Sequence, residues 1–159
     1  MNQADVSWSC QQVMHIICDV ERYPQFVPGC TSAQMLSNRP IEVSGESAQE
    51  WEAELTLSAR DLTQRLHTRN VQTANKLVMS LVSGSGLLQA LEGTWQVEPL
   101  AGKSGSRVWL ELHIKTSGLM AKATLKALGK PAIEAAAKRI IRAFDDEAAR
   151  RYGGTGNAV

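Results

Sequence analysis

The spacing of apolar residues changes twice along the chain, and this change constrains the fold more than any other feature. From about residue 31 apolar side chains recur at every second position, and after about residue 119 they recur at helical spacing. The clearest alternating runs are Trp51–Leu57 and Val108–Lys115, in which apolar residues alternate with polar or charged ones. A period of two is typical of a strand with one buried and one solvated face.

Further alternating runs predict strands around Leu62–Arg69, Leu77–Leu81 and Leu91–Val97. No helical segment separates these runs, so the strands are expected to pair antiparallel. The expected connections are short and rich in residues that favour turns: Asn38–Pro40, Ser44–Gly45, Thr73–Asn75 and Gly102–Gly105.

The segment before the strands predicts two short elements and a helix. The residues up to about Ser7 fit a short edge strand, and Ser9 fits the N-cap of an amphipathic helix over about residues 10–19. Pro24 and Pro28 then bracket a turn or a helix of a single turn, because proline removes a backbone donor and fixes φ.

A long helix is predicted from Leu119 to about Arg151, where Ala, Lys, Leu and Arg dominate. Gly129–Pro131 interrupts this segment and predicts a kink or a break. We expect a single domain over residues 1–153 and a flexible tail over 154–159.

These elements predict an α+β architecture. A sheet that is apolar on one face needs a cover, and the C-terminal helix is the only predicted element large enough to provide it. A curved antiparallel sheet wrapped around one long helix is the helix-grip fold. Such packing often leaves a cavity for a ligand between helix and sheet.

Composition excludes several classes of protein. The formal net charge of 159 residues is +1, which gives no general reason to expect nucleic acid as a partner. Three cysteines form no CxxC pattern and the histidines do not cluster, so no metal site and no required cofactor are predicted. No apolar run reaches the length of a membrane span, and the first residues lack the features of a signal peptide. We therefore expect a cytoplasmic protein, with contact at the inner membrane surface left open.

One motif identifies a family. The segment Asp19–Cys30, with Tyr23-Pro24 and Phe26-Val27-Pro28, resembles the signature of the coenzyme Q-binding, polyketide cyclase/dehydrase START-like family of the SRPBCC superfamily. Leu91–Leu100 resembles the Leu-Glu-Gly-x-Trp strand of that family, and Leu66–Asn70 lies where the family has an aromatic-Thr-Thr-Arg strand. The chain departs from the family at Gly84–Leu88, where Gly-Pro-Phe is common, so the size and gating of the ligand site are open.

The resemblance implies a START/Bet v 1-like helix-grip fold and three alternative functions. Quinone-binding members hold a polyprenyl quinone, so the leading expectation is a carrier or chaperone of ubiquinone or a related lipid that supports respiration. RatA-like ribosome association toxins of this family bind the large ribosomal subunit and block subunit association. Other relatives cyclise polyketides. The oligomeric state is not predicted.

The residues themselves favour a binder over an enzyme. His15, His67 and His113 lie on different predicted elements, and no catalytic triad or phosphate loop is present. The enzymatic alternative, a polyketide cyclase or aromatase, needs inward-facing polar groups, and a wholly apolar cavity would exclude it. The polar candidates are Arg65, His67 and Arg69, which strand alternation places on the face opposite Leu62 and Leu66. If strand curvature turned one of them inward, Arg69 could donate a hydrogen bond to a quinone carbonyl.

An isoprenoid or acyl tail is recognised mainly by apolar area, so the predicted ligand-contacting residues are mostly aliphatic and aromatic. They comprise a lip, the sheet face, and the helical segment: Tyr23, Phe26, Val27, Trp51, Leu55, Leu66, Arg69, Met79, Leu81, Trp95, Leu110, Leu112, Leu119, Leu128, Ile133 and Ile140.

A second candidate surface is a stripe of lysines. Lys122, Lys126 and Lys130 recur every four residues, on one face of the predicted helix. This stripe fits anionic lipid heads, ribosomal RNA phosphates, or an ordinary solvated helix face.

Overall fold

A computed structural model of the chain describes residues 2–59, 62–84, 88–116 and 129–153. The first elements are strand β1 (Asn2–Val6), helix α1 (Cys10–Ile17) and the 3₁₀ helix η1 (Val20–Gln25). Six strands, one helix and a final π-helical turn follow: β2 (Cys30–Val43), β3 (Glu46–Ala59), β4 (Leu62–Gln72), β5 (Lys76–Gly84), β6 (Leu88–Pro99), β7 (Ser106–Thr116), α3 (Lys130–Ala148) and η2 (Ala149–Gly153).

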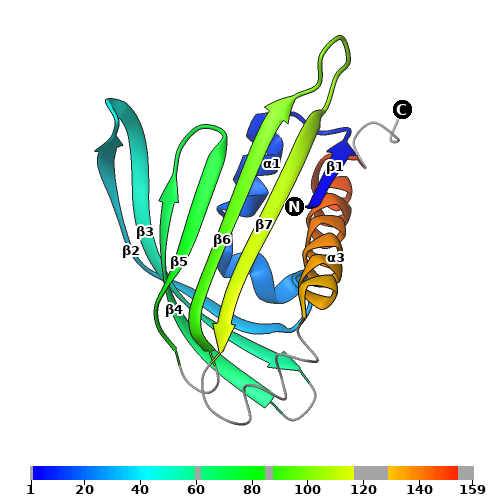
Figure 1. The fold of residues 1–159 in the computed structure, drawn as a ribbon. Coiled ribbons are helices and arrows are strands. Elements are labelled where there is room, and N and C mark those ends of the chain that lie inside the picture. Colours follow the sequence, from blue (N-terminus) through cyan, green and yellow to red (C-terminus); the bar gives the residue numbers. More distant parts are fainter. Residues whose placement is uncertain (1, 60–61, 85–87, 117–128, 154–159) are drawn as a thin grey trace.

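All seven strands form one antiparallel sheet in the order β1-β7-β6-β5-β4-β3-β2 (Figure 1). The N-terminal strand β1 pairs with β7, while β2 forms the opposite edge. The predicted edge strand, the antiparallel pairing and the run of strands between the short helices and the C-terminal helix are therefore confirmed.

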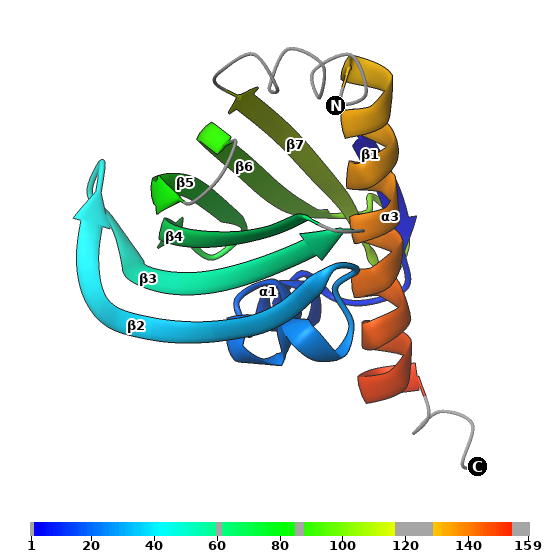
Figure 2. The ribbon, with the colours of Figure 1, turned by 90° about the horizontal axis from the view of Figure 1, so that it is seen from below.

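The sheet is strongly bent, and Figure 2 shows β2 and β3 curving below the other strands, with α3 across one end. Breaks in register occur in β2 between Cys30 and Ser32, in the β4–β5 pairing at His67/Thr68, and near Leu88 in β6. Bulges of this kind bend a strand and increase its twist. They help to give the sheet a concave inner face that a helix can close.

Helix α1 begins as the sequence predicts. The Ser9 side chain accepts a hydrogen bond from the Gln12 backbone N–H, and the Gln12 side chain accepts one from the Ser9 N–H. This reciprocal capping box satisfies two backbone donors that the helix cannot satisfy itself. The helix ends at Ile17, and the predicted turn around Pro24 falls in the six-residue 3₁₀ helix η1.

Helix α3 begins at Lys130, with Gly129 as its N-cap and Pro131 in the first turn. Proline is tolerated there because the first backbone N–H groups of a helix have no intrahelical partner. The predicted interruption at Gly129–Pro131 thus coincides with a helix start. The predicted helical residues before 129 and the tail 154–159 lie outside the described residues.

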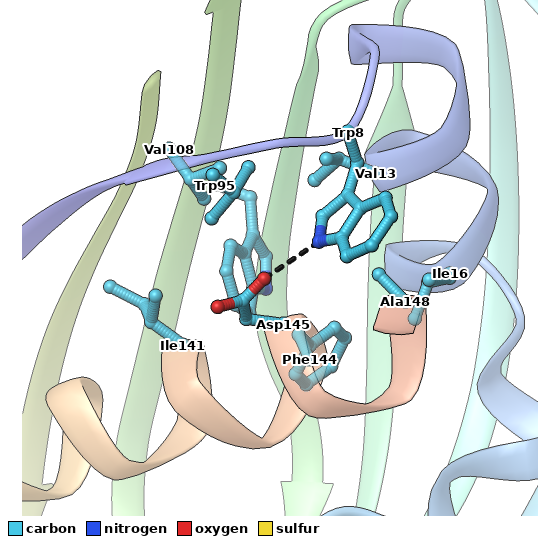
Figure 3. Close-up of a pocket in the computed structure, with 10 residues that line it drawn as sticks. Trp8, Val13, Ile16, Trp95, Val108, Ile141, Phe144, Asp145 and Ala148 are labelled. Carbon is cyan, nitrogen blue, oxygen red and sulfur yellow. Dashed lines mark hydrogen bonds between the residues drawn. The ribbon is translucent and has the colours of Figure 1, made fainter. Parts of the chain in front are cut away.

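The C-terminal half of α3 packs tightly against α1 and the sheet (Figure 3). Only about 10 Å³ of free space remains between Trp8, Ile141 and their neighbours, about the size of one water molecule. The Trp8 indole N–H donates to Asp145 Oδ1 at 2.7 Å, which joins the start of α1 to α3. No helix in the described ranges is long and apolar enough to cross a membrane.

Candidate ligand chamber

A partly open apolar cavity lies between the bent sheet, η1 and α3. We call this cavity of about 150 Å³ the chamber. Its wall combines residues of six strands with the η1 segment and one face of α3: Val20, Tyr23, Val27, Pro28, Cys30, Trp51, Leu55, Leu57, Thr68, Asn70, Leu77, Met79, Gly93, Trp95, Leu110, Leu112, Ile140 and Phe144.

The sheet side of the wall follows from the two-residue period of the strands. Trp51 and Leu55 in β3 and Leu110 in β7 point inward and are buried, while Glu52 and Glu54 lie on the other face. Gly93 in β6 pairs with Met79 on one side and Leu112 on the other. A Cβ atom at Gly93 would lie 3.1 Å from Met79 Cε and 3.3 Å from Leu112 Cδ2, so the missing side chain helps to keep the chamber open.

A cluster of four aromatic rings closes the chamber beneath α3. Phe144 of α3 lies 4.8 Å from Trp95, 5.1 Å from Phe26 and 5.5 Å from Tyr23, measured between ring centroids. The contacts with Tyr23 and Phe26 are edge-to-face, the geometry that aromatic quadrupoles favour. The cluster therefore joins η1, β6 and α3 at one point.

Tyr23 is held in place by its hydroxyl, which donates a hydrogen bond to the Ile17 carbonyl oxygen. Burial, with smaller contributions from Cys18, Cys30 and Asp19, raises the pKa of the Tyr23 hydroxyl above its ordinary value. Burial also raises the pKa of the Cys18 thiol to about 12. Both groups are therefore protonated at neutral pH, and neither is suited to act as a base there.

Ion pairs fasten the end of the helix to the η1 segment. Arg151 in η2 donates to Asp19 at 2.9 Å and to Glu147 at 2.9 Å, and its guanidinium lies 5.9 Å from the centre of the Phe26 ring. Arg150 donates to Glu147 at 2.7 Å. Burial opposes ionisation of Glu147, but the hydrogen bonds from Arg151 and Arg150 outweigh it and lower the pKa of this carboxyl.

Two polar side chains lie on the inner face of β4 and line the chamber. Thr68 and Asn70 are 1% and 2% exposed. Asn70 Nδ2 donates to the Trp51 carbonyl oxygen at 3.3 Å and to Thr68 Oγ1 at 3.1 Å, and Thr68 Oγ1 donates to the Ala53 carbonyl oxygen at 3.4 Å. The chamber is therefore apolar except for one hydrogen-bonded pair.

A larger, more open groove adjoins the chamber between β6, β7 and the first turns of α3. Its volume is about 790 Å³, and it shares Leu110 and Leu112 with the chamber wall. Leu81, Ile133 and Lys130 also line it, together with polar residues of β7.

The structure brings many of the predicted ligand-contacting residues to these two spaces. Leu81 and Ile133 lie on the groove, and Phe26 packs in the aromatic cluster. Leu66 is completely buried in the core. Apart from Arg69, the remaining described ones lie on the chamber wall: Tyr23, Val27, Trp51, Leu55, Met79, Trp95, Leu110, Leu112 and Ile140.

The structure does not bring Arg69 to the chamber. Arg69 is exposed on the outer face of β4, and His67 on the same face lies 2.8 Å from Glu52. Lys130 is exposed at the start of α3. Leu119, Lys122, Lys126 and Leu128 lie outside the described residues.

The sequence interpretation missed several residues of the wall. Thr68 and Asn70 share the parity of buried Leu66, and this signal was sufficient to place them inside. Phe144 fits the apolar period of the helix, but its contacts with Tyr23 and Phe26 depend on the tertiary fold. Gly93 shares the parity of buried Trp95 and Val97, but the space that it leaves depends on Met79 and Leu112 in the neighbouring strands.

The family model described as polyketide cyclase / dehydrase and lipid transport matches residues 6–141. The chain belongs to this family. Among curated relatives, the ribosome association toxin RatA of Pseudomonas aeruginosa is 32% identical over 147 residues, which cover 92% of each protein.

Solved structures agree on the fold of this family member. A START superfamily protein from Mycobacterium smegmatis has a TM-score of 0.60 at 20% identity, covering 87% of this chain and 95% of the other. The ZhuI aromatase/cyclase from Streptomyces sp. R1128 has a TM-score of 0.73 at 16% identity, covering 94% and 92%. The predicted START-like helix-grip fold is confirmed.

Proposed function

We propose that this protein binds a hydrophobic small molecule, with a ring in the chamber. The observation that supports this best is the apolar cavity of about 150 Å³ between the sheet, η1 and α3. An apolar cavity of about this size binds a single benzene ring in an engineered protein. Burial of apolar ligand surface contributes about 25 cal/mol per Å², so an apolar wall supplies affinity without charged groups.

Ubiquinone or a related isoprenoid lipid is the ligand class we favour. The chamber holds about one ring, and the adjoining groove of about 790 Å³ shares two leucines with it. A ring in the chamber would therefore place an attached isoprenoid tail along Leu81, Leu112 and Ile133. A carrier or chaperone of such a lipid needs no catalytic group.

The direct test is organic extraction of the purified protein followed by mass spectrometry for isoprenoid quinones and other lipids. Gly93→Val should abolish co-purification, because its side chain would enter the chamber beside Met79 and Leu112. Thr94→Val, at the next position of β6, is the control, since Thr94 lies on the opposite face of the strand, outside the chamber wall and the groove. Absence of any lipid from the wild-type extract, or equal amounts in both variants, would contradict the proposal.

A second candidate function is association with the large ribosomal subunit. It is supported by the identity of 32% with the ribosome association toxin RatA of Pseudomonas aeruginosa over 92% of both proteins. On helix α3, Lys138, Arg139 and Arg142 are exposed, and none forms an ion pair with another described residue. Basic side chains in such an arrangement suit RNA phosphates.

Co-sedimentation with purified large subunits at low salt tests this candidate. Changing Lys138, Arg139 and Arg142 to Glu should release the protein from the subunit, because charge reversal replaces phosphate attraction with repulsion. The predicted lysine stripe, changed to Glu at Lys122, Lys126 and Lys130, is compared in the same assay. No wild-type co-sedimentation at low salt removes this function.

Polyketide cyclisation stays a third hypothesis. A wholly apolar cavity would have excluded this activity, but the chamber is not wholly apolar because Thr68 and Asn70 line it. Among the described residues, the chamber wall contains no His, Asp, Glu, Lys or Arg, the side chains that most often move protons. We therefore favour binding over cyclisation.

A further inference from the structure

Thr68 and Asn70 are unusual residues for the centre of an apolar wall. They are nearly inaccessible to solvent, and the side chains around them include Trp51, Leu55 and Leu77. A buried polar group costs stability unless it is hydrogen-bonded. The bonds that each atom makes therefore show which polar atom is left for a ligand.

The orientation of the Asn70 amide is determined by its neighbours. The Trp51 carbonyl oxygen can only accept a hydrogen bond, so the Asn70 amide nitrogen must face it. The same nitrogen donates to Thr68 Oγ1, whose own proton goes to the Ala53 carbonyl oxygen. The amide oxygen Oδ1 is then the free end, and no hydrogen bond from any residue that the structure describes reaches it.

Two other donors on the wall, the Tyr23 hydroxyl and the Trp51 indole N–H, already have partners. The Tyr23 hydroxyl donates to the Ile17 carbonyl oxygen, and the Trp51 indole N–H donates to Gln72 Oε1 at 3.1 Å. Asn70 Oδ1, an acceptor on the wall of the chamber, thus has no hydrogen-bond partner among the described residues, and this atom is not sealed from the cavity. Its complement in a ligand is a hydrogen-bond donor.

We propose that the chamber ligand carries a hydroxyl group on its ring and that this hydroxyl donates a hydrogen bond to Asn70 Oδ1. The proposal rests on the ligand-binding function proposed above and specifies its ligand. Among isoprenoid quinones it selects the reduced quinol, which carries ring hydroxyls. The oxidised quinone offers only carbonyl acceptors, which would face another acceptor at this position.

Two isomeric single-ring probes of equal size test this preference. p-Cresol carries a hydroxyl donor, whereas anisole carries only an ether acceptor. Calorimetric titration of the wild-type protein should show tighter binding of p-cresol. In Asn70→Leu the ratio of the two affinities should fall about tenfold, the effect of one hydrogen bond that the ligand loses.

Thr68→Val is the matched control. It replaces the buried Thr68 hydroxyl by a methyl group, so the side chain keeps nearly the same shape. Asn70 Oδ1 stays in place, because the amide nitrogen still donates to the Trp51 carbonyl oxygen. This variant should keep the preference for p-cresol. A preference that disappears in Thr68→Val and persists in Asn70→Leu contradicts the assignment.

The outcomes separate this inference from the binding function. If anisole binds the wild type as tightly as p-cresol, or more tightly, the hydroxyl preference is overturned and the hydrophobic chamber still binds. If neither probe binds, both proposals fail. Should Asn70→Leu not fold, the NMR signals of the wild-type Asn70 side-chain amide give the same answer: p-cresol must shift them more than anisole does.

Discussion

Arg151 and Asp19 lie 132 positions apart in the chain, and Arg151 Nη1 donates a hydrogen bond to Asp19 Oδ2 at 2.9 Å. Asp19 is the N-cap of η1, the segment whose aromatic residues close one side of the chamber. Arg151 lies in η2, directly after α3, the helix that covers the chamber. The pair therefore joins the start of η1 to the turn that follows α3. The side chains of Arg151 and Asp19 are 20% and 30% exposed, so solvent only partly screens their attraction.

Arg151→Met should lower the free energy of unfolding by about 2 kcal/mol, because it removes charge-assisted hydrogen bonds to Asp19 and Glu147. Arg150→Met is the control, since Arg150 is 59% exposed and bonds only to Glu147 among the described residues. Its cost should stay below about 1 kcal/mol. Urea denaturation measures both, and equal losses would contradict a special role for Arg151.

Acid should weaken the ion pair between Arg151 and Glu147. The pKa of Glu147 is lowered in the folded protein from its ordinary value of 4.5, so its contribution to stability is present above that pH. The contribution is lost as the pH falls through the lowered pKa. Glu147→Gln should therefore show a shallower decline in unfolding free energy below pH 4.5 than the wild type. Some decline should remain because the hydrogen bond from Arg107 also lowers the pKa of Asp5. Parallel curves for the two proteins would argue against this assignment.

Phe144→Leu should destabilise the fold by about 1–2 kcal/mol, since the aromatic contacts with Trp95, Phe26 and Tyr23 are lost while most apolar volume is kept. Phe26→Leu should cost less, because Phe26 is only half-buried and has fewer contacts with the core. Thermal unfolding compares the two. A larger effect at Phe26 would mean that the cluster is not centred on α3.

The Trp8–Asp145 hydrogen bond in Figure 3 gives a spectroscopic prediction. Asp145→Ala should shift the indole N–H signal of Trp8 upfield and cost about 1.5–3 kcal/mol, as expected for a hydrogen bond to a charged group. Asp146→Ala, at the adjacent exposed position, should change neither quantity appreciably. An unchanged Trp8 signal in Asp145→Ala would show that the bond is not made in solution.

Local sequence signals predict much of this fold. The alternation at Trp51–Leu57 gives both a strand and its buried face, and Ser9 with Gln12 gives the start of α1. The apolar spacing from Ile133 to Ala148 gives the helix, and Pro131 marks its first turn. Each of these properties depends on residues close together in the chain.

The chamber is harder to predict because its shape depends on contacts between distant residues. Gly93 leaves space only because Met79 and Leu112 flank it in neighbouring strands. The free oxygen of Asn70 depends on the position of the Trp51 carbonyl in β3. The position of Arg69 on the outer face, by contrast, follows from strand parity, which is a local signal.

The central claim is that an unfilled apolar chamber lies between the sheet and α3. A crystal structure determined under xenon gas tests it without knowledge of the natural ligand, because xenon occupies dry apolar cavities. We predict a xenon atom bounded by Leu77, Trp95 and Ile140. Side chains that fill this space, with no xenon bound between sheet and helix, would contradict the account.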